Sequence, residues 1–237
     1  MLFYYVRHGD PIYDPDSLTP LGERQAEAVA KRLAVHGIDE VYTSTSNRAK
    51  LTAKPTLEML KLQATELDFC NESHAWQELT MVTPTGRRWL FGDNESLLLM
   101  TDPEFIRLGE KWYEHPKFAE YDFKKGLERI TEGCDELFLS LGYRHVRGTG
   151  KYIAENHNTK RVALFAHQGF GLAFLSCVLD IPYPIIAKCV DMCHSGVTVI
   201  NFNEMNGVSI PRMLMLSNDS HMYKEGLPTK YNNSIFI

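Results

Sequence analysis

Short apolar runs rich in β-forming residues alternate along this chain with stretches of helical periodicity, and this alternation restricts its fold more than any other feature. Residues 2–6 read Leu-Phe-Tyr-Tyr-Val, and similar runs occupy residues 38–43 and 162–166. Such runs are typical of strands buried on both faces, as in parallel sheets covered by helices. The helical stretches that follow them cover residues 20–33, 48–60 and 169–179. We therefore predict an α/β domain with a mostly parallel central sheet flanked by helices.

Local signals support these boundaries. Thr19 followed by Pro20 is typical of a helix N-cap and first helical position, and Gly37 stands where that helix should stop. Near the other end, residues 196–202 and 208–216 are β-rich runs separated by Asn206-Gly207. That dipeptide favours a hairpin turn, so we expect these two runs to pair with each other.

The segment from about residue 80 to residue 150 has a different character. It is charged, helical in pattern and broken by Pro84, Pro103 and Pro116. It is also unusually aromatic, with Trp89, Phe91, Phe105, Trp112, Tyr113, Phe118, Tyr121 and Phe123. We interpret it as a helical insertion that folds over one end of the sheet. Residues 1–237 are thus expected to form one domain with this insertion at about 80–150.

Charge and cysteine content exclude several classes of protein. The 25 Lys and Arg against 30 Asp and Glu leave a net charge of −5, whereas a nucleic-acid-binding protein normally has a basic excess. An anionic substrate would therefore need a few local cations. Five cysteines without a framework spacing indicate free thiols in a reducing compartment. Cys189 and Cys193 lack the further ligand cluster that a zinc site requires, so no metal is expected.

The chain shows no sign of membrane association. Its N-terminus lacks a basic region followed by a long apolar stretch, so we predict no signal peptide and a cytoplasmic location. Residues 162–179 contain no Asp, Glu, Lys or Arg over 18 positions, which approaches the length of a membrane span. Because His167, Gln168 and two glycines interrupt the run, we interpret it as a buried strand leading into a buried helix.

Two of the predicted strands end in a histidine followed closely by glycine. His8 follows the strand at residues 2–6 directly after Arg7, and His167 follows the strand at residues 162–166. Ligands of open α/β sheets bind beyond the carboxyl ends of the strands, so both histidines should lie at the same edge. Arg48 opens a helix just past another strand and can reach this edge too. Two arginines and two histidines there would form a pocket for a tetrahedral dianion.

Four segments resemble the histidine phosphatase superfamily, the phosphoglycerate-mutase-like group of phosphatases and mutases. They are Arg7-His8-Gly9, Leu18-Thr-Pro-Leu-Gly22, Ser44-Thr-Ser-Asn-Arg48-Ala-Lys-Leu-Thr-Ala53 and Ala166-His167. They occur in the family's order with compatible spacing and span nearly the whole chain. The resemblance implies a phosphoglycerate-mutase-like fold.

The resemblance also assigns catalytic roles. His8 would be the nucleophile that takes the phosphoryl group on a ring nitrogen, while Arg7, Arg48 and His167 bind the phosphoryl oxygens. A neutral imidazole is nucleophilic, and arginines can stabilise the charge on these oxygens without a metal. No organic cofactor is implied.

Family members place an acidic proton donor after the third strand, often in an Asn-Glu context, and Asn71-Glu72 is the match. Glu72 is therefore the predicted general acid, and Glu78 and Asp68 are the alternatives.

Further residues are candidates for contact with the substrate. Asp10 and Tyr13 follow the nucleophile, and His221 lies in a segment that resembles one closing the family's pocket. Arg87 and Arg88 offer a second anion-binding point, although a solvated basic pair fits them equally well.

Three functions remain in competition. The chain departs from family mutases at Asp14, where they carry Asn, and after Glu72, where it lacks their basic, tyrosine-containing stretch. These departures favour a phosphomonoester hydrolase over a phosphoglycerate-mutase-type phosphoryl mutase. A non-catalytic phospho-ligand-binding module is third, because His8 and Glu72 are both present.

Thr45, Ser46 and Gln168 also depart from the family pattern and are expected at the rim of the pocket. The expected partner is a small-molecule phosphate ester, and the sequence fixes neither its identity nor the oligomeric state.

Overall fold

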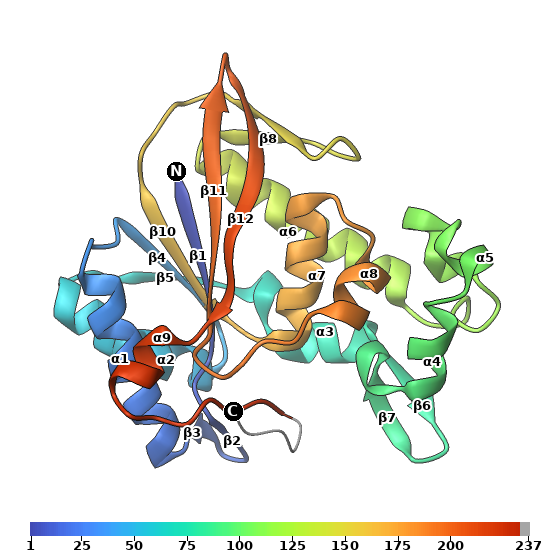
Figure 1. Cartoon of the computed structure of the whole chain (residues 1–237), viewed down its shortest axis with the longest axis horizontal. Helices are drawn as coiled ribbons and strands as arrows, with labels where there is room; N and C mark the ends of the chain where they lie inside the picture. The colour runs from blue at the N-terminus through green and yellow to red at the C-terminus, as the bar shows by residue number, and fades with distance from the viewer. Residues whose placement is uncertain (233–237) are drawn as a thin grey trace.

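A central sheet of eight strands forms the frame of the molecule (Figure 1). The computed structural model describes residues 1–232. From edge to edge, the strands of the sheet are β5 (Ala64–Leu67), β4 (Glu40–Ser44), β10 (Arg161–Ala166), β1 (Leu2–Arg7), β11 (Val197–Met205), β12 (Val208–Asn218), β9 (Lys151–Ala154) and β8 (Tyr143–Val146). Two small hairpins lie outside it, one formed by β2 (Pro11–Tyr13) and β3 (Asp16–Leu18), the other by β6 (Thr80–Thr83) and β7 (Gly86–Trp89).

The prediction of a mostly parallel sheet is confirmed at one side. Strands β5, β4, β10 and β1 run parallel, and the register aligns Arg7 of β1 with Ala166 of β10. From β1 to β8 every neighbouring pair is antiparallel. The predicted hairpin is confirmed as β11 and β12, whose turn places Asn206 and Gly207 at positive φ. The antiparallel half thus begins where β11 enters the sheet antiparallel to β1, and the β11–β12 hairpin continues it.

Helices cover both faces of the sheet. The described helices are α1 (Pro20–Ala34), α2 (Asn47–Leu60), α3 (Glu72–Glu78), α4 (Asn94–Leu99), α5 (Pro103–Ile106), α6 (Phe123–Ser140), α7 (Gln168–Leu179), α8 (Tyr183–Cys189) and α9 (Ser220–Lys224). Figure 1 shows α1 and α2 on one side of the sheet and α6 and α7 on the other. Side chains of β1 alternate accordingly: Val6 packs with Val29 of α1, whereas Phe3 and Tyr5 belong to the core around Phe174 of α7.

The run at residues 162–179 is a buried strand and a buried helix, as predicted, because it forms β10 and α7. Within the described residues, no helix is long and apolar enough to cross a membrane.

The segment 80–150 differs from the expected helical insertion in two respects. It begins with the β6–β7 hairpin, and it ends with α6 and β8, which belong to the sheet and its cover. Between them, short helices surround Trp112, which is almost fully buried and lies 5.0 Å from Phe123 and 5.8 Å from Tyr183 between ring centroids. The aromatic residues therefore build an extension of the main core, a role that local periodicity does not reveal.

The loop after β1 packs directly on the start of α1. Thr19 caps this helix, since its hydroxyl accepts a hydrogen bond from the Gly22 N–H at 3.1 Å. A Cβ atom added to Gly9 would lie 2.7 Å from the Gly22 carbonyl oxygen, and one added to Gly22 would lie 2.3 Å from the Asp10 carbonyl oxygen. Two glycines are therefore required where this loop crosses the helix.

Candidate active site

The parallel register of β1 and β10 brings the two predicted histidines together. Each follows the last residue of its strand, and their ring centroids lie 5.3 Å apart. Both side chains are almost fully buried. The hydroxyl of Tyr5 donates to the His167 carbonyl and accepts from its N–H, so the backbone of the second histidine is fixed to β1.

The geometry of His8 determines its tautomer. Its Nδ1 lies 2.7 Å from the Gly9 carbonyl oxygen, which can only accept, so Nδ1 carries the hydrogen. Nε2 consequently keeps its lone pair. Burial lowers the pKa of His8 well below its usual value, and the nearby His167, Arg7 and Arg48 lower it further. His8 is thus a neutral imidazole with a free nitrogen at neutral pH.

Two arginines flank the histidines, and each is held by its terminal nitrogens. Arg7 is 1% exposed and donates to the Met192 carbonyl and the Asn232 side chain. Arg48, at the N-terminus of α2, donates to Asp16 Oδ1 at 2.8 Å. The Nε atoms of both arginines are buried without a hydrogen-bond partner. Because such donors are costly to leave unpaired, they indicate a missing acceptor.

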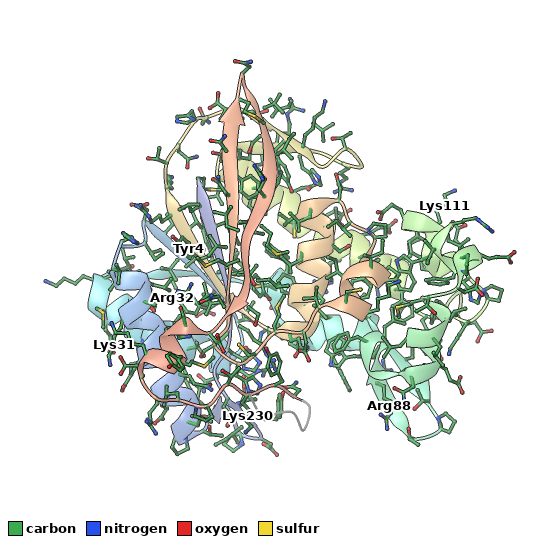
Figure 2. The ribbon with its side chains drawn as sticks, viewed as in Figure 1. Tyr4, Lys31, Arg32, Arg88, Lys111 and Lys230 are labelled. Atoms are coloured by element: carbon green, nitrogen blue, oxygen red, sulfur yellow. The ribbon has the colours of Figure 1, made fainter. Side chains whose placement is uncertain are left out.

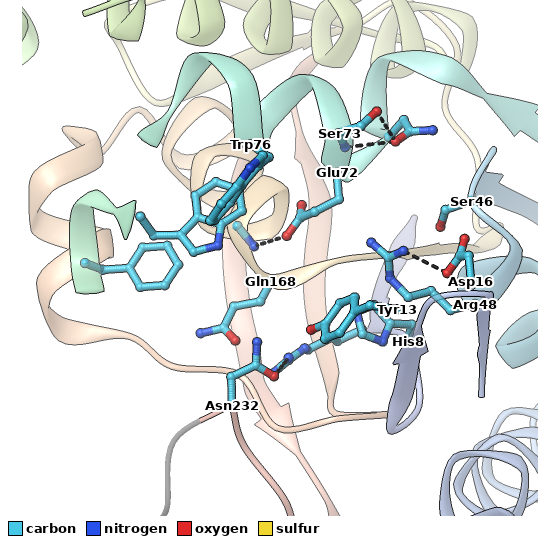
Figure 3. A pocket seen from close by; sticks show the side chains of 15 residues that line it. His8, Tyr13, Asp16, Ser46, Arg48, Glu72, Ser73, Trp76, Gln168 and Asn232 are labelled. Atoms are coloured by element: carbon cyan, nitrogen blue, oxygen red, sulfur yellow. Dashed lines mark hydrogen bonds and ion pairs between the residues drawn. The ribbon is translucent and has the colours of Figure 1, made fainter. Parts of the chain in front are cut away.

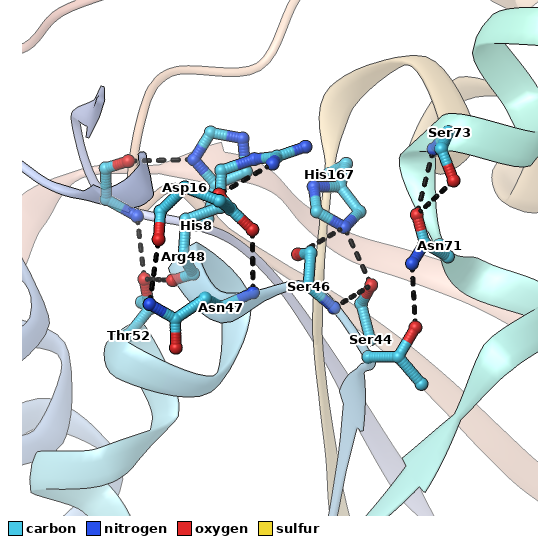
Figure 4. A network of polar contacts seen from close by, with 12 residues as sticks. His8, Asp16, Ser44, Ser46, Asn47, Arg48, Thr52, Asn71, Ser73 and His167 are labelled. Carbon is cyan, nitrogen blue, oxygen red and sulfur yellow. Dashed lines mark hydrogen bonds and ion pairs between the residues drawn. The ribbon is translucent and has the colours of Figure 1, made fainter. Parts of the chain in front are cut away.

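His167 offers a third donor of the same kind. Its Nε2 lies 2.8 Å from Ser44 Oγ and 3.2 Å from Ser46 Oγ (Figure 4). Its Nδ1 is buried without a partner. Serine hydroxyls can donate to Nε2, which leaves the hydrogen on Nδ1. Burial and the two arginines, Arg48 and Arg7, hold the pKa of His167 well below its usual value, so this ring is also neutral.

Glu72 is held at the start of two helices. It is the first residue of α3, and its Oε1 and Oε2 accept the N–H groups of Gly169 and Phe170 in the first turn of α7, both at 2.9 Å. Burial raises the pKa of Glu72, although these N–H groups and the two arginines oppose the shift. A partly buried carboxyl with a raised pKa suits proton donation.

The alternative carboxylates are engaged elsewhere. Glu78 forms an ion pair with Arg129 at 2.6 Å, and Asp68 is largely exposed and lies 2.9 Å from His74 Nε2. Glu72, unlike these two, lines the cavity.

One cavity of about 660 Å³ contains the predicted centre (Figure 3). Its polar lining includes Arg7, His8, Asp16, Ser46, Arg48, Asn71, Glu72, Ser73, Gln168 and Asn232. Its aromatic lining consists of Tyr13, Trp76, Trp89 and Phe91. Figure 3 shows Glu72 entering the cavity from α3, with Arg48 and His8 across from it.

Tyr13, one of the predicted substrate contacts, lies at the cavity and packs over the Arg48 guanidinium at 5.5 Å. Asp10, His167 and His221 are not among the described residues that line it, although the His167 ring contacts that of His8. Asp10 accepts a hydrogen bond from the Thr19 hydroxyl and lies 2.7 Å from Nζ of Lys230, a residue labelled in Figure 2. His221 is buried beside Arg32, 3.2 Å away.

The arginine pair also lies outside the cavity lining. Arg87 donates to Thr80 and Arg88 to Thr85, so both serve the β6–β7 hairpin, on which Figure 2 labels Arg88.

Three site residues were missed by the sequence analysis. Asp16 orients Arg48 and also accepts the Asn47 N–H at 2.7 Å, which caps α2. His194 stacks on His8 with ring centroids 5.7 Å apart, and burial and Arg7 lower its pKa to about 3. Asn232 joins Arg7 to His194 Nε2. Asn232 lies far from every motif in the sequence. Asp16 lies two residues before the Leu18–Gly22 segment and His194 precedes a predicted strand, but neither position indicated a role.

Within residues 1–232, no group of three or more His, Cys, Asp or Glu side chains could hold a metal ion. Cys189 is exposed and Cys193 is buried, and all five described cysteines are free thiols.

Comparisons with known proteins agree with this geometry. Residues 3–94 match the sequence model of the histidine phosphatase superfamily (branch 1), a range that includes Arg7, His8, Arg48 and Glu72. A curated relative, the PE-PGRS family protein PE_PGRS11 of Mycobacterium tuberculosis, is 32% identical over 101 residues. That match covers 37% of this chain and 17% of the relative, so the chain spans a small part of the relative's length.

Solved structures share the fold over nearly the whole chain. Phosphoserine phosphatase from Entamoeba histolytica, in complex with 3-phosphoglyceric acid, has a TM-score of 0.59 at 16% identity, covering 93% of this chain and 98% of that one. Mycobacterial glucosyl-3-phosphoglycerate phosphatase has a TM-score of 0.58 at 19% identity, covering 92% and 99%. Bacillus stearothermophilus YhfR has a TM-score of 0.59 at 17% identity, covering 93% and 98%. Residues 3–94 thus resemble the histidine phosphatase superfamily, and the chain as a whole shares the fold of these solved phosphatases.

Proposed function

We propose that the protein is a phosphomonoester hydrolase that acts through a covalent phosphohistidine on His8. One observation carries the proposal: the free Nε2 of a neutral His8 lies among three buried donors that lack acceptors, on Arg7, Arg48 and His167. A phosphoryl group has the charge and the number of oxygens to satisfy all three.

In the first step, His8 Nε2 attacks phosphorus and the bond from phosphorus to the ester oxygen breaks. The protonated carboxyl of Glu72 gives its proton to the departing oxygen, so the alcohol leaves neutral. Arg7 and Arg48 stabilise the charge on the equatorial oxygens. Because the arginines supply this charge, the proposed reaction uses no metal.

In the second step, water attacks phosphorus and the bond from phosphorus to His8 Nε2 breaks. Glu72, now a carboxylate, accepts the proton from water, and inorganic phosphate is released. The enzyme returns to a neutral His8 and a protonated Glu72, so the cycle consumes one water for each ester.

The cavity favours hydrolysis over phosphoryl mutation. A mutase must hold a second phosphate while His8 is rephosphorylated, which requires further positive charge. Among the described residues that line the cavity, only Arg7 and Arg48 are cationic. Arg87, the residue suggested for a second anion, bonds to Thr80 on the hairpin.

Small phosphate esters are the proposed substrates. Two proteins of the same fold are a phosphoserine phosphatase and a glucosyl-3-phosphoglycerate phosphatase, which supports this class. The five described free thiols support the reducing, cytoplasmic location suggested by the sequence.

The test is phosphate release in the presence of a chelator, from a panel that includes an aryl phosphate and several alkyl phosphates. Labelled ester should leave an acid-labile, alkali-stable phosphoryl group on the protein. His8→Ala should abolish both signals, while His36→Ala, which changes an exposed histidine, should keep them. Release that persists in His8→Ala would refute the phosphohistidine route. A wild type inactive on every ester, with or without a bisphosphate primer, would refute the hydrolase itself.

A further inference from the structure

The cavity has an aromatic wall, formed by Trp76 of α3, Trp89 at the end of β7 and Phe91 just beyond it. Trp89 and Phe91 are stacked, with ring centroids 5.6 Å apart and planes inclined by 11°. Trp76 meets Trp89 edge to face at 5.1 Å. Figure 3 shows Trp76 on the side of the cavity away from Arg48 and His8.

The aromatic wall begins directly beside the proposed proton donor. The Trp89 indole approaches Gly169 so closely that a Cβ atom there would lie 2.3 Å from the ring. The N–H of the same Gly169 holds Glu72 Oε1 at 2.9 Å. An ester oxygen protonated by Glu72 therefore leaves next to Trp89, and the rest of the leaving group extends along the aromatic wall.

The charges at the cavity disfavour an anionic leaving group. Of the described lining residues, the two arginines are the cations, and both are committed to the phosphoryl oxygens in the proposed reaction. The carboxyl groups of Asp16 and Glu72 also line the cavity. A carboxylate on the leaving group would meet no free cation there and would be repelled.

We infer that the preferred substrates are phosphomonoesters whose leaving group is an uncharged aromatic ring system that packs on Trp76, Trp89 and Phe91. This inference rests on the proposed hydrolase function. Offset and edge-to-face ring contacts favour an aromatic group over an aliphatic chain of similar size. Trp76, Trp89 and Phe91 are thus specificity-determining residues.

The test compares kcat/KM for three primary alkyl phosphates whose leaving alcohols have similar acidity: 2-(2-naphthyl)ethyl phosphate, n-octyl phosphate and 3-phosphoglycerate. We expect the naphthyl ester to exceed each of the others by about tenfold or more. Trp89→Leu and Trp76→Leu should each reduce that ratio several-fold. Trp76 is 38% exposed, so its replacement keeps the test valid if Trp89→Leu does not fold. Tyr223→Leu, at an exposed aromatic residue of α9 outside the cavity lining, should leave the ratio unchanged.

The inference would be overturned if kcat/KM for 3-phosphoglycerate equalled or exceeded that for the naphthyl ester. It would also be overturned if the octyl and naphthyl esters had equal kcat/KM. A ratio unaffected by both tryptophan variants would also overturn it. In each of these cases wild-type turnover and phosphohistidine trapping would persist, so the proposed function would stand. Absence of turnover and of trapping with all three esters would instead refute the hydrolase.

Discussion

The two sides of the cavity are built by different parts of the chain. The proposed phosphoryl side is lined by Arg7, His8 and Arg48, and the ring of His167, which is not among the described lining residues, packs against His8. These residues lie at the ends of β1 and β10 and the start of α2. Arg7, His8 and His167 are buried, Arg48 is partly buried, and backbone carbonyls and short polar side chains hold these groups. The aromatic wall comes from α3 and the hairpin segment, and Trp76 is partly exposed.

This contrast separates two tasks. Residues at the ends of sheet strands are fixed by neighbouring strands, which suits chemistry that tolerates little displacement. Side chains on short peripheral elements can change without disturbing the sheet, which suits the selection of leaving groups. Glu72 joins the two sides, because α7 holds its carboxylate and Trp89 packs beside it.

The largest effect is expected for Glu72→Gln. A positioned general acid contributes about 10²- to 10⁴-fold, so kcat for an alkyl phosphate should fall within that range. The loss should be much smaller for 4-nitrophenyl phosphate, whose leaving group departs without a proton. Steady-state kinetics on both esters measures the difference, and Asp68→Asn, at an exposed carboxylate, is the control. Equal losses on both esters would show that Glu72 is not the proton donor.

Arg48→Lys tests whether the phosphoryl side acts alike on every substrate. Lysine keeps the charge but loses the planar fork that binds Asp16 and phosphoryl oxygens, so we expect about a 10²-fold loss of kcat/KM. The loss should be the same for naphthyl and octyl esters. Arg24→Lys, on the exposed face of α1, should have no effect. A loss that depended on the leaving group would contradict the division of the cavity.

The pH profile provides a third test. His8 must be neutral to attack, and burial with its cationic neighbours lowers its pKa well below 6.5, so the neutral form persists in mildly acidic solution. After correction for ionisation of the substrate, kcat/KM should show no acidic limb near 6.5, and should fall tenfold per pH unit only below the lowered pKa. The raised pKa of Glu72 should set the basic limb, which Glu72→Gln should remove. An acidic limb at 6.5 would contradict the proposed environment of His8.

His145 is not among the described residues that line the cavity, and it differs from His8 because its partners are carboxylates. Its Nδ1 lies 2.8 Å from Asp135 and its Nε2 3.1 Å from Asp180. Burial disfavours its charge, but these two carboxylates outweigh burial and raise the pKa of His145. The charged form therefore stabilises the fold below about pH 6.5, and this contribution is lost as the pH rises through the raised pKa.

We accordingly expect His145→Gln to lower the free energy of unfolding by about 1.5–3 kcal/mol at pH 6 and to leave kcat/KM unchanged. The difference in free energy of unfolding between His145→Gln and the wild type should be smaller at pH 9. Urea denaturation at both pH values measures it. His157→Gln, which alters an exposed pair with Glu204, should cost less than about 1 kcal/mol. A deficit independent of pH would show that His145 is neutral in the folded protein.

The sequence predicted the elements that carry the phosphoryl side because each is defined locally. The helix cap at Thr19 and the apolar runs of β1 and β10 could be recognised without knowledge of distant residues. The predicted meeting of His8 and His167 followed from a general property of parallel sheets and is confirmed by their register. The prediction that residues 80–150 are helical was incomplete. Aromatic residues occur in strands as well as in helices, so tertiary packing decides which structure they adopt.

By itself, the sequence determined the α/β frame, the edge at which its histidines meet and the family resemblance, because these depend on periodicity and short motifs. Tertiary structure alone decided that Asp16 orients Arg48 and that His194 and Asn232 support the site. It also separated Glu72, which lines the cavity, from the alternatives Glu78 and Asp68, which do not. It also placed Trp89 against Gly169 beside Glu72. These contacts join residues up to 225 positions apart, and such pairings depend on how the whole core packs.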